Sequence, residues 1–116
     1  MISKNSKEEI IQGLLVTKQK AHALEVRLLL KGKEKEGKKV ARKSKALSRK
    51  IDILLGQVMD EWQGQGNKII KDIKSANADL QKSIAEIKRN VKTAQNIVKA
   101  IGLIDDAIGM AKGFIG

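Results

Sequence analysis

The stretch that decides the fold is the C-terminal segment IVKAIGLIDDAIGMAKGFIG, residues 97–116. At about 100° per residue on a helical wheel, its aliphatic side chains cover about half of the circumference, and its aspartates and glycines gather on the other half. An apolar surface this wide exceeds the narrow strip that a coiled-coil partner covers. Residues 101–115 are therefore predicted to form an amphipathic helical segment whose apolar half must be sheltered by protein or by lipid.

Upstream of this segment, apolar residues recur at a spacing of seven. The row consists of Ile73, Leu80, Ile87, Ala94, Ile101, Ile108 and Ile115. A heptad row of this length is typical of coiled-coil packing, so it predicts one long third helix over residues 67–100 that continues into the tail. The neighbouring apolar row shifts from Val91 and Val98 to Ile97 and Ile104, which indicates that the tail faces a different surface. A kink near Gly102 would allow the tail to fold back.

Two earlier stretches have the same alternating spacing of three and four between apolar residues. They predict helices over residues 6–31 and 38–63, separated by a charged connector at 31–39. The sequence GQGN at 64–67 supplies two glycines and an asparagine, which favour a tight turn before the third helix. Residues 1–116 are therefore interpreted as one domain, an elongated antiparallel all-α bundle of three helices with an amphipathic C-terminal segment.

Composition agrees with a thin aliphatic bundle. The chain has no proline and no cysteine, and its aromatic residues are Trp62 and Phe114. Packing of aliphatic side chains must therefore hold the fold. If the turn at 64–67 makes the second and third helices antiparallel neighbours, the chain after Ala94 projects beyond the bundle, at the same end as the connector 31–39.

Asn77 is the one polar residue in the row beside the heptad seam. A single buried asparagine can fix the register of packed helices at some cost in stability. Because Asn77 lies near the start of its helix, an exposed position fits the pattern equally well. The sequence leaves both interpretations open.

The formal charge of +11 points to an anionic partner. Residues 31–50 contain ten basic and two acidic residues, so most of the excess lies there. The candidate basic patch consists of Lys38, Lys39, Arg42, Lys43, Lys45, Arg49 and Lys50. Such a patch could follow a phosphate backbone without reading its sequence, although no aromatic residue lies within it to stack on a base.

Self-association, or binding of another helical protein, is the leading functional prediction. The predicted interaction surface consists of Ile97, Ile101, Ile104, Ile108, Phe114 and Ile115. The first alternative is a membrane-acting protein, of the interfacial or pore-forming type, that uses the amphipathic tail and the adjacent basic cluster. The second alternative is sequence-independent nucleic-acid binding through the basic patch.

Catalysis is not predicted, and neither is a cofactor, a metal or a small-molecule substrate. His22 is the only histidine, and its place at the edge of an apolar stripe favours a packing role. The chain has no tyrosine, no Glu-x-x-His pair and no phosphate-binding loop. Neighbouring acidic residues such as Asp105 and Asp106 point about 100° apart on a helix, so they do not converge on an ion.

The N-terminus lacks the form of a secretory signal, and no apolar run reaches the length of a spanning helix. We therefore expect a cytoplasmic protein or one exported by a non-classical route. Trp62-Gln63-Gly64, at the expected turn, resembles the turn of the Trp-x-Gly family, which implies small helical dimers exported without a Sec signal. The chain departs from that family in three respects. It has an additional predicted N-terminal helix and a strongly positive net charge, and it lacks the tyrosine found in the family's C-terminal secretion signal.

Overall fold

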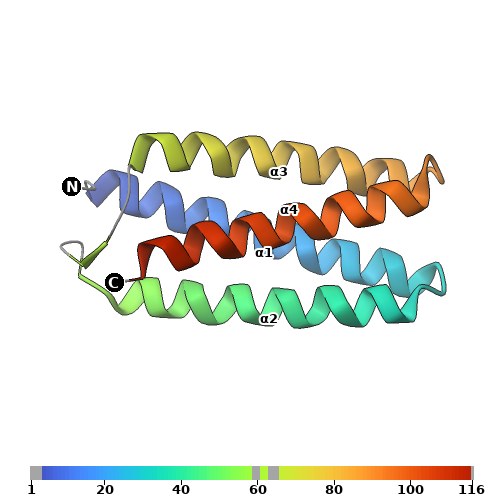
Figure 1. The fold of residues 1–116 in the computed structure, drawn as a ribbon, viewed down its shortest axis with the longest axis horizontal. Coiled ribbons are helices and arrows are strands. Elements are labelled where there is room, and N and C mark those ends of the chain that lie inside the picture. The colour runs from blue at the N-terminus through green and yellow to red at the C-terminus, as the bar shows by residue number, and fades with distance from the viewer. Residues whose placement is uncertain (1–3, 59–60, 63–65, 116) are drawn as a thin grey trace.

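A computed structural model describes residues 4–58, 61–62 and 66–115, and within these residues the chain is an all-α bundle of four helices (Figure 1). The helices are α1 (Lys4–Leu30), α2 (Glu34–Gly56), α3 (Gly66–Lys88) and α4 (Thr93–Phe114). The bundle measures 45 × 22 × 15 Å. The all-α class is confirmed, whereas the predicted count of three helices is wrong.

The long third helix of the prediction is two helices joined by a sharp turn. Asn90 has a positive φ of 61°, and the Val91 N–H donates to the Glu86 carbonyl at 2.8 Å. This is the geometry of a Schellman motif, in which a left-handed residue closes a helix. The chain therefore reverses at residues 89–92, and Gly102, where a kink would have allowed the tail to fold back, lies inside α4.

α1 ends in the same way. Gly32 has a φ of 75°, and the Lys33 N–H donates to the Leu28 carbonyl at 2.8 Å. α2 then begins at Glu34, so the predicted connector 31–39 is reduced to residues 31–33. Glu34 and Glu36 lie in the first turn of α2, where carboxylates complement the partial positive charge of a helix start.

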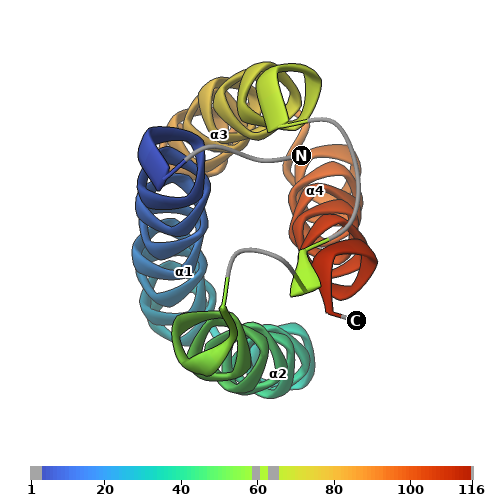
Figure 2. The ribbon, with the colours of Figure 1, turned by 90° about the vertical axis from the view of Figure 1, so that its left-hand side faces the viewer.

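Viewed end-on, the helices occupy four corners in the order α1, α2, α4, α3 (Figure 2). α2 and α3 therefore lie at opposite corners, and they are not the antiparallel neighbours that the turn at 64–67 predicted. α2 ends at Gly56, earlier than predicted, and α3 begins at Gly66. Gly66 and Asn67 belong to α3, while Gly64 and Gln65 lie outside the described residues.

α4 does not project beyond the bundle, because its apolar half packs against the other helices. Ile104 and Phe114 have no exposed surface. Ile104 shares a buried cluster with Leu28 and Ile87, and Phe114 shares a second one with Leu14. The shelter that the amphipathic tail requires is thus supplied by the chain itself.

The α1–α3 contact contains a polar pair and a close approach. Asn77 is 8% exposed and accepts a hydrogen bond from Thr17, which resolves the open question of its position in favour of burial. One turn away, a Cβ added to Gly13 would lie 2.6 Å from Cγ2 of Ile73. The glycine therefore allows the two helices to approach more closely than a larger residue would permit.

At the end opposite the two tight loops, Trp62 covers the core. Its ring centroid lies 5.2 Å from that of Phe114, and the Lys7 ammonium lies 5.4 Å from the Trp62 ring centroid. Lys7 also donates to the Gln57 carbonyl at 2.6 Å. Aromatic and cation–π contacts therefore tie the α2–α3 connection to α1 and α4. Gln63 and Gly64, which carried the rest of the Trp-x-Gly pattern, lie outside the described residues.

Candidate functional site

The predicted interaction surface on the tail largely faces the interior of the bundle. Ile97, Ile104 and Phe114 are buried, and the remaining three residues are half-buried. Those three are Ile101, Ile108 and Ile115. The periodicity identified real packing residues, but the surface they pack against belongs to the same chain.

The predicted basic patch lies on the outer side of α2. The exposed members are Lys38, Lys39, Arg42, Lys45 and Arg49, and the half-buried members are Lys43 and Lys50. Lys43 faces α4, where its Nζ donates to Oδ1 of Asp105 at 2.5 Å. One predicted member of the patch is therefore paired within the bundle.

The structure enlarges this patch by bringing a second loop beside it. The Lys31 ammonium, in the α1–α2 loop, donates to Oδ1 of Asn90 in the α3–α4 loop. Both loops lie at the same end of the bundle (Figure 1). We call this end the basic pole and define it as residues 29–39 and 88–98. It contains eight basic and two acidic residues, a formal charge of +6.

The net charge of the whole chain lies in the half of the bundle that ends in the basic pole. Residues 17–45 and 77–103, which form the halves of the four helices nearer to the two loops, contain 16 basic and 5 acidic residues. The rest of the chain contains 8 of each. One half therefore has a formal charge of +11, and the other is neutral.

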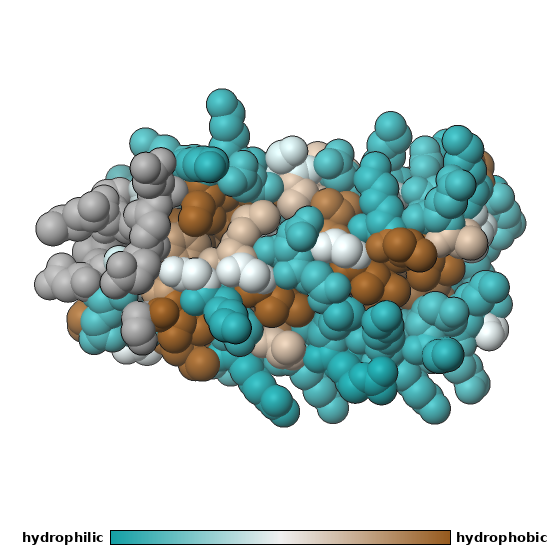
Figure 3. All heavy atoms as spheres, in the orientation of Figure 1, coloured by the Kyte–Doolittle hydropathy of each residue, from teal (hydrophilic) through white to brown (hydrophobic). Residues whose placement is uncertain are grey.

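Large apolar side chains are exposed among these charges. At the basic pole, Leu30 is 72% exposed and Val98 is 73% exposed, and Leu29 and Val91 are also exposed. Figure 3 shows apolar surface on one face, toward this end, bordered by hydrophilic side chains. The pole therefore offers cationic and apolar groups together.

Sequence reasoning missed the contribution of the α3–α4 loop to this site. Lys88, Arg89 and Lys92 belong to the pole only because the chain turns at Asn90. A signal was present, since basic residues in a last helical turn followed by asparagine are typical of a helix C-terminus. The apolar spacing of seven continues from Ile87 to Ala94 across this turn, so the sequence pattern favoured one continuous helix.

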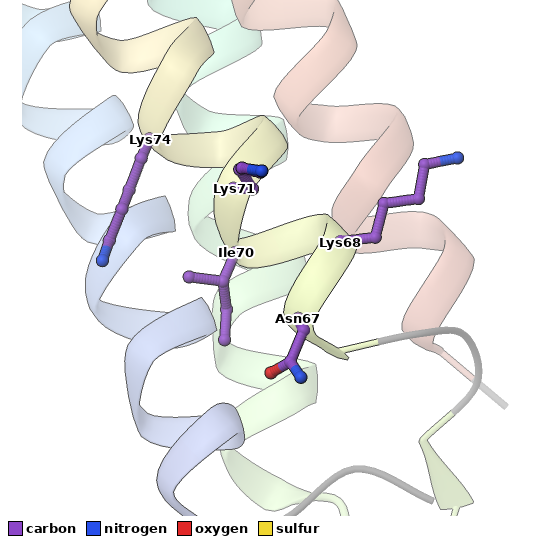
Figure 4. Close-up of a pocket in the computed structure, with 5 residues that line it drawn as sticks. All are labelled: Asn67, Lys68, Ile70, Lys71 and Lys74. Carbon is purple, nitrogen blue, oxygen red and sulfur yellow. The ribbon is translucent and has the colours of Figure 1, made fainter.

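Two further features of the described residues are a hollow at the start of α3 and the surface residue His22. The hollow at the start of α3, about 510 Å³ in volume, is lined by one helix, and the side chains of Lys68, Lys71 and Lys74 point in different directions (Figure 4). Among the described residues, no three histidine, aspartate or glutamate side chains gather as a metal site would require. His22 lies on the surface, and its Nδ1 is 3.8 Å from Oε1 of Glu25. Its predicted packing role is wrong.

The chain was compared with protein families, curated proteins and solved structures, and it matches none of them. The function must therefore be argued from the geometry of the chain.

Proposed function

We propose that the protein binds anionic membrane surfaces peripherally, through the basic pole, as a folded bundle. The observation that carries the proposal is the exposure of Leu30, Val91 and Val98 among the basic residues of the pole. A membrane surface offers both complements, anionic headgroups for the lysines and the acyl boundary for the apolar side chains.

The magnitudes are sufficient for reversible binding. A basic residue close to an anionic membrane contributes about 1 kcal/mol, and the pole has six in excess. Full burial of one leucine or valine side chain adds about 1.5–3 kcal/mol. Because the cost of immobilising the protein reduces this sum, binding should depend on both contributions and weaken with salt.

This proposal changes the role that the sequence alone gave to the tail. The apolar half of α4 is packed inside the bundle, so docking uses the loops at the end of the bundle. Among the described residues, no helix combines the length and the apolar character of a membrane span. Peripheral contact needs neither a spanning helix nor release of α4 from its neighbours.

A membrane explains the pole better than a nucleic acid does. A phosphate backbone would pair with the lysines but would leave Leu30 and Val91 without a complement. Base stacking requires aromatic side chains, and the two aromatic residues pack together at the opposite end. The burial of Ile104 and Phe114 within one chain also favours the membrane proposal over self-association through the tail surface.

Vesicle co-sedimentation tests the proposal. The full chain should bind vesicles of phosphatidylcholine mixed equally with phosphatidylglycerol and should not bind phosphatidylcholine alone. Lys38→Glu combined with Arg89→Glu should weaken binding at least about tenfold, because two favourable charges become repulsive. The matched control, Lys71→Glu with Lys74→Glu, makes the same change in net charge in the neutral half and should bind nearly as well as the native chain.

A second pair of variants tests the apolar contribution. Leu30→Ser should weaken vesicle binding, whereas Leu55→Ser, at another exposed position in the neutral half, should not. Equal binding by all variants would reject the pole as the docking surface. Binding to random duplex DNA that depends on Lys38 and Arg89 but not on Leu30, with no binding to vesicles, would replace the membrane with nucleic acid.

A further inference from the structure

A groove between α2 and α4 opens at the basic pole. It has a volume of about 350 Å³, within the range of small-molecule sites. Its α4 side is apolar and includes Ile97, Val98 and Ile101. Ile97 is buried and Ile101 half-buried, while Val98 stands on the exposed edge. The groove therefore has an apolar wall that continues to the surface.

The α2 side of the groove is cationic. Lys33, Lys35 and Lys39 line it and are exposed, and Glu36 is the acidic residue among its lining. In the described part of the chain, none of the three ammonium groups takes part in an ion pair or a hydrogen bond. Positive charge not neutralised by the protein thus lies directly beside exposed apolar surface.

We propose that this groove binds one single-chain anionic amphiphile, with its hydrocarbon against α4 and its acidic headgroup among Lys33, Lys35 and Lys39. The inference rests on the proposed function, because it assigns to the same pole a single lipid molecule of the kind that an anionic membrane contains. A fatty acid and an acidic lysophospholipid share the required chemistry, a chain and an anionic head.

The two halves of the ligand are both needed. A headgroup without a chain would meet only exposed lysines, whose individual attraction for an anion in water is weak. A chain with a neutral head would gain the apolar wall but leave the lysines unpaired. Selectivity for an anionic amphiphile therefore follows from the pairing of the two walls.

Solution NMR on the full chain tests the site with monomeric lysophosphatidylglycerol, kept below its micelle concentration. We expect saturable shifts centred on Ile97, Val98 and Ile101. Glycerol phosphate supplies the head alone and lysophosphatidylcholine a chain with a neutral head, so both should bind at least about tenfold more weakly. Laurate in place of the lysophospholipid distinguishes a carboxylate source from a phosphate source, and saturable shifts from either support the site.

Val98→Glu places a carboxylate on the exposed edge of the groove and should weaken lysophosphatidylglycerol binding at least about tenfold. Val26→Glu is the matched control, since Val26 is also exposed, lies on α1 and does not line the groove. Shifts spread over the whole chain, or equal binding by both variants, would overturn the inference.

Vesicle binding measured on the same samples separates this inference from the proposed function. If the native chain sediments with anionic vesicles but shows no saturable shifts with either amphiphile, the groove site is rejected and the docking pole stands. If saturable groove shifts occur without vesicle binding, the ligand assignment is supported and the membrane proposal is rejected.

Discussion

Thr17 of α1 and Asn77 of α3 form a buried hydrogen bond, with 2.5 Å between Oγ1 of Thr17 and Oδ1 of Asn77. The Asn77 amide nitrogen donates to the Gly13 carbonyl at 3.0 Å, and Thr17 Oγ1 lies 3.0 Å from the same oxygen. The Thr17 hydroxyl, the Asn77 side-chain amide and the Gly13 carbonyl thus form hydrogen bonds with one another, between two parallel helices whose contact is otherwise aliphatic. Such a group fixes the register of α1 against α3, because sliding either helix would leave buried polar atoms unpaired.

A double-mutant cycle tests this pair. Thr17→Val should lower the free energy of unfolding by about 1–3 kcal/mol, because Asn77 Oδ1 loses its donor in the core. Asn77→Leu, a change of similar shape, should cost a comparable amount. The double variant should cost less than the sum of the two, as measured by urea unfolding followed by circular dichroism. Strict additivity would contradict the coupling.

Gly13→Ala should destabilise the bundle by about 1–3 kcal/mol, since the new methyl group would meet the buried Ile73 side chain at 2.6 Å. Gly109→Ala is the matched control, because no atom lies within 4 Å of its added Cβ and it is exposed in the interior of α4. It should stabilise the protein by about 1 kcal/mol through its better helix propensity. Thermal unfolding of both variants checks the opposite signs.

Lys92, which precedes α4, adopts a left-handed backbone with φ 43° and ψ 48°. Lys92→Gly should therefore be more stable than Lys92→Ala by about 1 kcal/mol, because only glycine occupies this region without steric cost. Both variants lose the same charge, so the difference between them isolates the backbone. Equal midpoints in urea would argue against a strained turn at this position.

Phe114→Ala should lower the free energy of unfolding by about 3–5 kcal/mol, because it empties a fully buried site under Trp62. Trp62 is the only tryptophan, so its fluorescence reports the change directly and should shift to longer wavelength as water reaches the ring. Val98→Ala, at an exposed position of the same helix, should change neither stability nor emission appreciably. An unshifted spectrum for Phe114→Ala would contradict the contact.

The sequence predicts the helical class and most core residues, because apolar periodicity directly reflects the face that each helix buries. Leu24, Leu28, Leu47 and Leu80 all lie in the core as their spacing predicts. The same spacing misplaced Ala94 and Val98, which are exposed, because the heptad row continues across the turn at residues 89–92. The shift of the neighbouring apolar row from Val91 and Val98 to Ile97 and Ile104 is the feature of the sequence that reflects this turn.

Which helices are neighbours could not be predicted from local pattern. A tight turn at 64–67 favours adjacent helices, but α2 ends at Gly56, and α3, which begins at Gly66, lies at the opposite corner. The candidate site depends on this arrangement, since the groove forms where α2 lies beside α4. The basic residues of α2 could be read from the sequence, whereas the apolar wall that faces Lys39 could not.

The net charge of +11 lies in one half of a bundle that is 45 Å long. At physiological ionic strength the field of a charged surface decays over about 8 Å, much less than that length. An approaching molecule would therefore experience a torque before contact, because an anionic surface attracts the charged half of the bundle and exerts no net attraction on the neutral half. Molecules that approach with the long axis parallel to the surface would be turned so that the basic pole faces it. The uneven distribution of charge should therefore raise the association rate as well as the affinity of the final complex.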